Sequence, residues 1–190
     1  MTKFRIAIFA SGTGTNAEEI FKYFQDHLSI EVVLLLSNNR NAYALERARK
    51  RNVATITFTK QEFYDTQYVL SQLQQHGITH LVLAGFMWLI PQHLIKEFSG
   101  RIINIHPALL PKFGGKGMYG MKVHESVKAM GETETGITIH DVNEKYDDGK
   151  ILFQAKCVVD TNDTPEQIAN KVHELEYRYF PKVVEKWIIG

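Results

Sequence analysis

Hydrophobic and polar positions follow two alternating patterns over the first hundred residues. Continuous apolar runs, rich in β-branched residues, occur at 4–9, 30–37, 54–58, 80–84 and 101–106. Helical patterns lie between them: one begins at Asn16, one spans 43–51 and one begins at Gln61. Strands that are apolar throughout are typical of a sheet buried on both faces, and strands that alternate with helices indicate parallel pairing. The sequence therefore predicts an α/β fold with a mainly parallel sheet flanked by helices.

The pattern changes after residue 130. Two apolar runs, 134–142 and 150–159, are joined by the short polar segment 143–149. This arrangement predicts a C-terminal antiparallel hairpin added to the sheet. The chain has 190 residues and no linker-like or repeated segment, so we expect a single domain.

The last helix has a clear start signal. Thr164 is followed by Pro165 and Gln167, which is the pattern of an N-cap, a first-turn proline and a capping box. Further along, Pro181 is expected to interrupt or restart this helix, because proline lacks the backbone N–H that a helix interior needs.

Composition and charge narrow the classes of function. Formal net charge is +1 with acidic and basic residues interleaved, so there is no broad basic face of the kind that nucleic acid or anionic lipid requires. No apolar run is long enough to cross a bilayer, and the first residues enter a strand pattern without the features of a signal peptide. We therefore expect a cytoplasmic protein with small-molecule partners, and with neither nucleic acid nor membrane as a partner.

The loop "ASGTGTN" at 10–16 leads from the first strand into the first helix and is predicted to bind a phosphate. Its glycines expose backbone N–H groups at a positive helix end. The loop also fits the loose dinucleotide pattern G-x-G-x-x-A, but NAD would require an acidic residue at the end of the second strand, which ends in Ser37, Asn38, Asn39 and Arg40. NADP stays open through Arg40, and so does a glycine turn that binds nothing.

The strand at 101–106 carries polar residues on one face. Asn104 and His106 are two residues apart and therefore point the same way, whereas Ile103 and Ile105 point to the other face. Pro107 then turns the chain out of the sheet where the imidazole is presented. Ligands of open α/β sheets collect at the carboxyl ends of the strands, so this amide and imidazole are candidates for a site.

The tip of the predicted hairpin supplies a candidate carboxylate. Asp147 and Asp148 precede Gly149, which turn chemistry alone would explain. In the strand before the tip, Thr138 and His140 share one face and are candidates to line the same crevice. A carboxylate beside an imidazole raises the imidazole pKa, fixes its orientation and holds a water for proton transfer.

Two other features receive a structural interpretation. His76 and His80 have a metal-ligand spacing, but Gly77 places them across a helix-to-strand turn, so we predict no metal site. The glycine-rich stretch at 114–120 lacks the spacing of a P-loop and is expected to be a mobile lid or a flexible surface loop.

Several stretches together resemble one family over essentially the whole chain. They are "SGTGTN" at 11–16, "VLAGFM" at 82–87, "INIHPALLPKFGG" at 103–115, "YDDGKILFQ" at 146–154 and the terminal-helix glutamate Glu176. This combination is similar to the glycinamide ribonucleotide transformylases, the phosphoribosylglycinamide formyltransferases of purine biosynthesis. The resemblance implies a nucleotide-binding-like formyltransferase fold, and transfer of a formyl group from 10-formyltetrahydrofolate to the amine of glycinamide ribonucleotide.

The resemblance also implies roles for individual residues. The catalytic trio of the family falls on Asn104, His106 and Asp147. The residues expected to bind the acceptor are Gly14, Thr15 and Asn16 at its phosphate, and Glu176 with His173 at its ribose. The residues expected to line the folate cleft are Met87, Trp88, Leu89 and Ile90, together with Asn143, Glu144 and the segment up to Asp147. Trp88 is a departure, because members of the family have an arginine at this position.

The resemblance gives the chain an expected organisation and several alternatives. We expect one formyltransferase domain over 1–190, with a phosphate- and nucleotide-binding half at 1–100 and a catalytic and folate-binding half at 101–190. Methionyl-tRNA formyltransferase, formyltetrahydrofolate hydrolase and sugar-amine formyltransferases are related alternatives. The first two have a further domain, and the last lack the "SGTGTN" loop. A non-catalytic NADP-binding regulator is an alternative from another class, and it would not require Asn104, His106 and Asp147.

Overall fold

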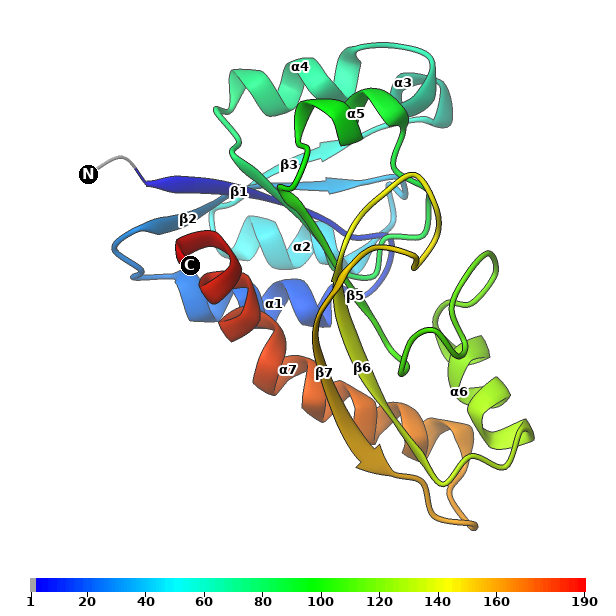
Figure 1. Cartoon of the computed structure of the whole chain (residues 1–190). Helices are drawn as coiled ribbons and strands as arrows, with labels where there is room; N and C mark the ends of the chain where they lie inside the picture. Colours follow the sequence, from blue (N-terminus) through cyan, green and yellow to red (C-terminus); the bar gives the residue numbers. More distant parts are fainter. Residues whose placement is uncertain (1–2) are drawn as a thin grey trace.

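The computed structural model describes residues 3–190, which form one mixed sheet with helices on both faces (Figure 1). The seven strands are β1 (Phe4–Phe9), β2 (Ile30–Ser37), β3 (Ala54–Thr57), β4 (His80–Leu83), β5 (Ile102–His106), β6 (Glu134–Asp141) and β7 (Ile151–Val158). The helices are α1 (Thr15–Phe24), α2 (Tyr43–Lys50), α3 (Lys60–Tyr64), α4 (Tyr68–Gln75), α5 (Gln92–Glu97), α6 (Met121–Ala129) and α7 (Pro165–Ile189).

The strand order is β3-β2-β1-β4-β5-β6-β7. Pairing is parallel from β3 to β5, and it becomes antiparallel between β5 and β6 and between β6 and β7. The predicted parallel sheet and its C-terminal antiparallel hairpin are therefore confirmed. The chain grows outward from β1 in one direction and then from β4 in the other, so the order reverses between these two strands, where open α/β sheets commonly bind ligands.

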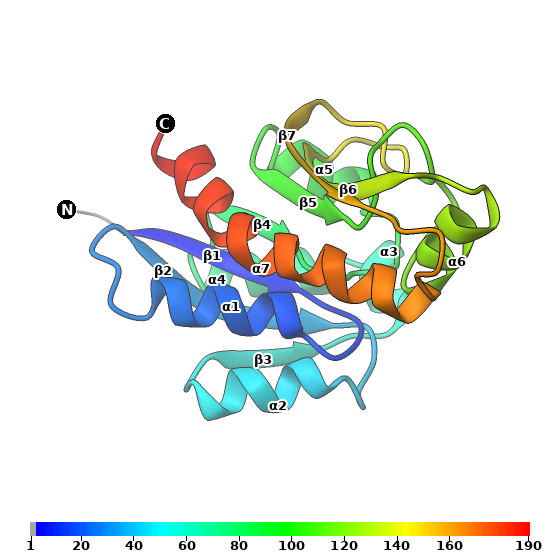
Figure 2. The ribbon, with the colours of Figure 1, turned by 90° about the horizontal axis from the view of Figure 1, so that it is seen from below.

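Each face of the parallel part is buried under a different set of helices (Figures 1 and 2). Ile6 and Ile8 belong to a core shared with α1, α2 and α7, whereas Ala7 and Phe9 belong to a core shared with α3, α4 and α5. Burial of both faces explains why these strands are apolar at every position.

The two faces of β5 differ in polarity. Ile103 and Ile105 of β5 pack in the core that contains Val172 and Phe180 of α7. Asn104 and His106 point to the opposite face, and their register partners on β6 are His140 and Thr138. The alternation predicted for this strand is confirmed, and it produces a polar stripe across the antiparallel part of the sheet.

Helix α7 starts as predicted but does not break where expected. The Thr164 hydroxyl accepts from the Gln167 N–H, and the Gln167 side chain accepts from the Thr164 N–H, so the capping box is confirmed. The expected interruption at Pro181 is wrong, because one helix runs from Pro165 to Ile189. Pro181 is buried between Phe180 and Val184, and this packing against the sheet holds the helix together across the missing hydrogen bond.

The other helices show what the apolar pattern left out. The helix expected from Gln61 is two helices, because α3 ends at Tyr64 and α4 begins at Tyr68. Helices α5 and α6 were not predicted. As expected, His76 is the C-cap that follows α4 and His80 begins β4, so they are not one turn apart on a helix. Within residues 3–190, no helix combines the length and apolar character needed to span a membrane.

Candidate active site

The loop between β1 and α1 has a backbone conformation that requires glycine. Gly14 is the N-cap of α1 and has a φ of 71°. A Cβ atom added there would lie 2.5 Å from the Cβ of Ala44, because the start of α2 packs directly against the loop. The Ala44 N–H also donates to the Gly12 carbonyl at 3.1 Å. The predicted phosphate loop is thus a rigid turn that opens at a helix N-terminus.

Polar residues at the end of β2 hold this loop. The Ser11 hydroxyl donates to the Asn38 side chain at 2.7 Å, and the Asn39 side chain donates to the Ser11 carbonyl at 3.3 Å. The Ser11 hydroxyl also accepts from the Met87 N–H at 3.1 Å, which ties the loops after β1 and β4 together. The asparagines that stand where a dinucleotide site needs an acid are therefore used to position the loop.

Asn16 and Glu176 meet although 160 positions separate them in the chain. The Asn16 side chain donates to Glu176 Oε2 at 2.9 Å, while Asn16 Oδ1 is buried and has no partner among residues 3–190. Glu176 is 5% exposed, and burial raises the pKa of its carboxyl to about 7, although the bond from Asn16 lowers it. Two residues expected at the acceptor site thus form one buried polar pair next to the phosphate loop.

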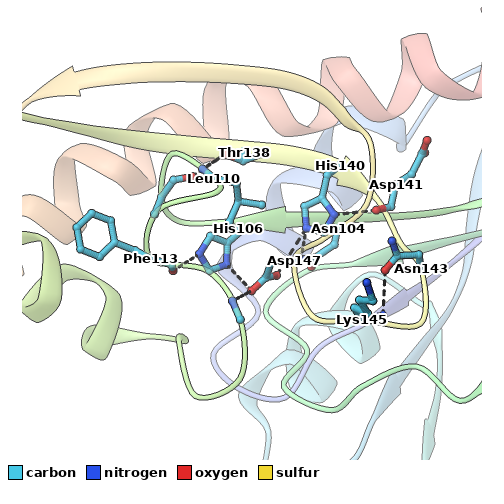
Figure 3. Close-up of polar contacts among 12 residues, drawn as sticks. Asn104, His106, Leu110, Phe113, Thr138, His140, Asp141, Asn143, Lys145 and Asp147 are labelled. Carbon is cyan, nitrogen blue, oxygen red and sulfur yellow. Dashed lines mark hydrogen bonds and ion pairs between the residues drawn. The ribbon is translucent and has the colours of Figure 1, made fainter.

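Asn104 is held by His140 across the β5–β6 pair (Figure 3). His140 Nδ1 lies 2.8 Å from the Asp141 carbonyl, which only accepts, so Nδ1 carries a proton and donates it. Nε2 lies 3.0 Å from Asn104 Nδ2 and 3.7 Å from Asp147 Oδ1. In the neutral imidazole Nε2 accepts from the Asn104 amide, and in the imidazolium it carries a proton that favours the Asp147 carboxylate. The bond between Asn104 and His140 fixes the orientation of the Asn104 amide and leaves its second N–H available.

His106 is held between a carbonyl and a carboxylate (Figure 3). Its Nε2 lies 2.8 Å from the Phe113 carbonyl and therefore donates to it. Its Nδ1 lies 3.5 Å from Asp147 Oδ2. The side chain is only 4% exposed, so both contacts act in a water-poor environment that strengthens them.

Asp147 is positioned by the segment that follows Phe113. Its Oδ2 accepts from the Gly115 N–H at 2.9 Å, and its backbone φ is 52°, an uncommon conformation for a residue with a side chain. Gly114 allows the close approach, because a Cβ there would lie 2.5 Å from Leu110 Cδ2 and 3.3 Å from Asp147 Cβ. The structure thus brings the predicted trio of Asn104, His106 and Asp147 together.

The protonation of the pair differs from the expectation. Burial lowers the pKa of His106, and it outweighs the opposing effects of the Asp147 carboxylate and the Phe113 carbonyl. The expectation that Asp147 raises this pKa is correct for that contact, but the net shift is downward. Burial also opposes the charge of Asp147, yet His140, His106 and the Gly115 N–H together lower the pKa of its carboxyl, which favours the carboxylate.

A cleft lies beside the trio, and only part of the predicted folate set lines it. Trp88, Leu89 and Ile90 form one wall, and Tyr146 and Asp147 form another. The lining also includes Leu83, Phe86, Asn104, His140, Val142 and Lys145. The other predicted cleft residues do not line the cleft. Met87 is 45% exposed, Asn143 donates to Asp148, and Glu144 accepts from Gln92.

Trp88 belongs to an aromatic cluster behind the cleft wall. Its ring lies 5.9 Å from Phe63 and 6.1 Å from both Phe58 and Tyr64. The Tyr64 hydroxyl donates to the Leu89 carbonyl at 2.9 Å, which fixes the backbone beside Trp88. The position of the expected arginine is therefore filled by an indole that rigidifies this wall.

His124 was missed by the reasoning from sequence. It lies on α6, is 2% exposed, and its ring centroid is 6.4 Å from that of His173, a predicted acceptor residue on α7. Burial lowers the pKa of His173. The signal that could have found His124 is a polar residue beside Val123 in the stretch "MKVHESVKA", but the helical pattern there is short. No group of three or more His, Cys, Asp or Glu side chains suited to a metal occurs within the described part of the chain.

Comparisons with known proteins give one family. Residues 4–184 match the family described as "Formyl transferase". The chain is 40% identical over 186 residues to "Phosphoribosylglycinamide formyltransferase, chloroplastic" of Arabidopsis thaliana, a match that covers 95% of this chain and 64% of that protein. It therefore spans somewhat less than two thirds of that relative.

Two bacterial proteins are matched over nearly their whole length. The chain is 34% identical to phosphoribosylglycinamide formyltransferase of Bacillus subtilis, over 96% of this chain and 93% of that protein. The crystal structure of the Bacillus halodurans protein of the same name superposes with a TM-score of 0.87 at 34% identity, and the match covers 98% of this chain and 96% of that one.

Proposed function

This chain belongs to the formyl transferase family, and from that premise we propose that it transfers a formyl group from 10-formyltetrahydrofolate to the amine of glycinamide ribonucleotide. The observation that carries the proposal is the meeting of Asn104, His106 and Asp147 at the carboxyl end of β5, beside a cleft. Family membership supports a folate-type formyl donor, and the names of the relatives support this acceptor.

Asn104 and His106 stabilise the oxygen on which charge develops. When the acceptor amine attacks the formyl carbon, a carbon–nitrogen bond forms and the carbonyl oxygen becomes an oxyanion. The free N–H of Asn104 donates to it. His106 donates from Nδ1 once that nitrogen is protonated and the oxyanion takes the place of Asp147 Oδ2, because Nε2 is held by the Phe113 carbonyl. Each preorganised donor of this kind typically contributes about 3–4 kcal/mol of transition-state stabilisation. His140 supports this role because it holds the Asn104 amide in one orientation.

Asp147 takes part in the proton transfer from the attacking amine to the folate nitrogen. The attacking amine must lose a proton while the bond between the formyl carbon and the folate nitrogen breaks and that nitrogen gains one. The depressed pKa of Asp147 keeps a carboxylate ready to hold a water for this relay, with His106 alongside. This mechanism needs no covalent enzyme intermediate.

The acceptor binds through its phosphate and ribose. Gly14, Thr15 and Asn16 present N–H groups to the phosphate at the start of α1. Glu176 and His173 on α7 bind the ribose hydroxyls. The donor occupies the cleft, where Trp88, Leu89 and Ile90 face Tyr146 and Asp147. Met87, Asn143 and Glu144 then act at its rim.

Further features of the chain remain part of this proposal. We propose one formyltransferase domain over 1–190 with small-molecule substrates, no nucleic-acid or membrane partner, no metal and a cytoplasmic location. These statements rest on the sequence.

Calorimetry and turnover together test the function. We expect wild-type protein to bind glycinamide ribonucleotide, to bind the dephosphorylated nucleoside far more weakly, and to give no signal with NADP, because the loop recognises a phosphomonoester on a ribose. With 10-formyltetrahydrofolate added, formyl transfer is expected in the wild type and is lost in His106→Ala.

The variant separates chemistry from binding. His106→Ala is expected to keep its affinity for the ribonucleotide, because the imidazole acts on the oxyanion and the phosphate loop lies elsewhere. Tight NADP binding without a response to the ribonucleotide would contradict the proposed function. Near-normal turnover in His106→Ala would remove His106 from the mechanism.

A further inference from the structure

His124 is a buried imidazole without a role in the reaction described above. It lies on the inner face of α6 next to Val123 and Val127, and its side chain is almost fully covered. Its Nδ1 is buried and has no hydrogen-bond partner among residues 3–190. A buried polar group without a partner costs stability, and packing between Val123 and Val127 gives no reason for an imidazole at this place.

His124 lies between the two ends of the proposed site. Its ring makes an edge contact with His173 of α7, with centroids 6.4 Å apart and planes at 85°. Figure 2 shows α6 beside the N-terminal part of α7. Burial lowers the pKa of His124 to about 4, and the nearby His173 and His106 lower it further. The imidazole is therefore neutral at pH 7, and its neighbours are one acceptor-site histidine and the catalytic one.

The order of these groups matches the order of groups in the acceptor. Phosphate and ribose come first, at the α1 loop and at Glu176 and His173. The attacking amine comes last, at Asn104 and His106. An amide joins the ribose to the carbon that bears this amine, so it has to lie between those two ends. A neutral imidazole suits an uncharged amide, because neither partner brings a charge that must be neutralised in a dry site.

The tautomer of His124 follows from its surroundings. A neutral imidazole carries one proton, and a buried N–H without an acceptor is rarer than a buried acceptor without a donor. With no acceptor at Nδ1, the proton belongs on Nε2. We propose that His124 is a substrate-contacting residue that donates from Nε2 to the carbonyl oxygen of the glycinamide arm. This inference rests on the proposed function and names the residue that recognises the arm of the acceptor.

Two ligands and two variants test this assignment. Ribose 5-phosphate has the phosphate and the ribose of the acceptor but lacks the amide arm. We expect His124→Leu to bind glycinamide ribonucleotide about 5- to 30-fold more weakly than wild type, the loss typical of one hydrogen bond. Its affinity for ribose 5-phosphate is expected to be unchanged. His124→Gln, which carries an N–H near the position of Nε2, is expected to recover part of the loss.

The outcomes separate a contact from a structural role and from failure of the function. Equal loss with both ligands, or no loss with either, overturns the role of His124. If wild-type protein does not bind the ribonucleotide, the proposed function fails and takes this inference with it. If it binds and only the His124 result is negative, the function stands. Should His124→Leu unfold, His124→Asn provides the same test, because its amide is too short to reach the position of Nε2.

Discussion

At the scale of single residues, His106 is under two opposing influences. Burial lowers the pKa of its imidazole, while Asp147 and the Phe113 carbonyl favour the protonated form. Because the Phe113 carbonyl accepts from Nε2, Nδ1 faces the carboxylate, and protonation of Nδ1 creates a charge-assisted hydrogen bond. Asp147 therefore determines how much of the His106 population carries the second proton.

Replacing Asp147 by asparagine should shift this balance. We expect the pKa of His106 in Asp147→Asn to lie below its wild-type value, because an amide cannot stabilise the imidazolium. If the protonated form is active, activity is lost as pH rises through this pKa, so that limb of the pH–rate profile moves to lower pH. Turnover should fall about 10²- to 10⁴-fold with loss of the proton relay.

An NMR titration of the His106 ring measures this pKa directly. The control is Asp148→Asn, because Asp148 is half exposed and pairs with Asn143 and Lys145 rather than with His106. An Asp147→Asn variant with an unchanged His106 titration and an unchanged rate would return Asp147 to the role of a turn residue.

Strand periodicity explains how much of the site was predictable at this scale. Asn104 and His106 followed from the two-residue repeat of one strand, and the same repeat put Thr138 and His140 on one face of another strand. The structure shows that these two lie opposite His106 and Asn104. The bond between Asn104 and His140 depends on the register between two strands, and the position of Phe113 depends on an irregular loop. Neither leaves a periodic signal in the sequence.

At the scale of secondary-structure elements, packing decided the cases in which local signals were weak or misleading. Capping boxes start two helices, α3 at Thr59 and α7 at Thr164, and each needs only two side chains three residues apart. Pro181 has an equally strong local preference, yet α7 passes through it because both neighbouring turns are buried against the sheet. Helix α6 follows the N-cap Gly120 and has no side-chain cap, so its start leaves little signal in the sequence.

The contact between the phosphate loop and α2 leads to an element-scale prediction. Gly14→Ala should lower the free energy of unfolding by about 2–4 kcal/mol, because it adds a side chain at a positive φ and forces a contact with Ala44. Affinity for glycinamide ribonucleotide should fall as well, since the start of α1 moves.

Gly12→Ala is the matched control in the same loop. A Cβ added at Gly12 would have no atom within 4 Å. The free energy of unfolding of this variant, measured by chemical denaturation, should therefore lie within about 1 kcal/mol of the wild-type value. Equal stability of the two variants would show that α2 does not constrain the loop.

At the scale of the whole molecule, the fold brings together residues that lie far apart in the chain, such as Asn16 and Glu176. The strand order reverses between β1 and β4, where open α/β sheets commonly bind ligands, and α7 runs back along the face of the sheet that α1 also covers (Figures 1 and 2). Alternating strands and helices predicted the sheet, but no local pattern predicts that Asn16 meets Glu176. That contact depends on the path of α7 against α1, which only the complete fold determines.

The burial of Glu176 makes global stability depend on pH. The carboxyl has a pKa of about 7 in the folded chain, against an ordinary glutamate pKa of 4.5. Between these values the folded state binds more protons than the unfolded state, so the contribution of Glu176 to stability falls as pH rises through this window. Glu176→Gln removes the effect, because an amide needs no proton to stay neutral.

We therefore expect Glu176→Gln to match wild type near pH 4.5 and to exceed its unfolding free energy above pH 7 by an amount on the order of 2–3 kcal/mol. Denaturant unfolding at a series of pH values measures the difference. Glu174→Gln, an exposed change on the same helix, should follow wild type throughout.

The gain in stability should come with weaker binding of glycinamide ribonucleotide, since the carboxylate that is costly to bury is the group proposed to accept from the ribose hydroxyls. If Glu176→Gln is no more stable than wild type at pH 8, the pKa of this carboxyl is not raised in the free protein.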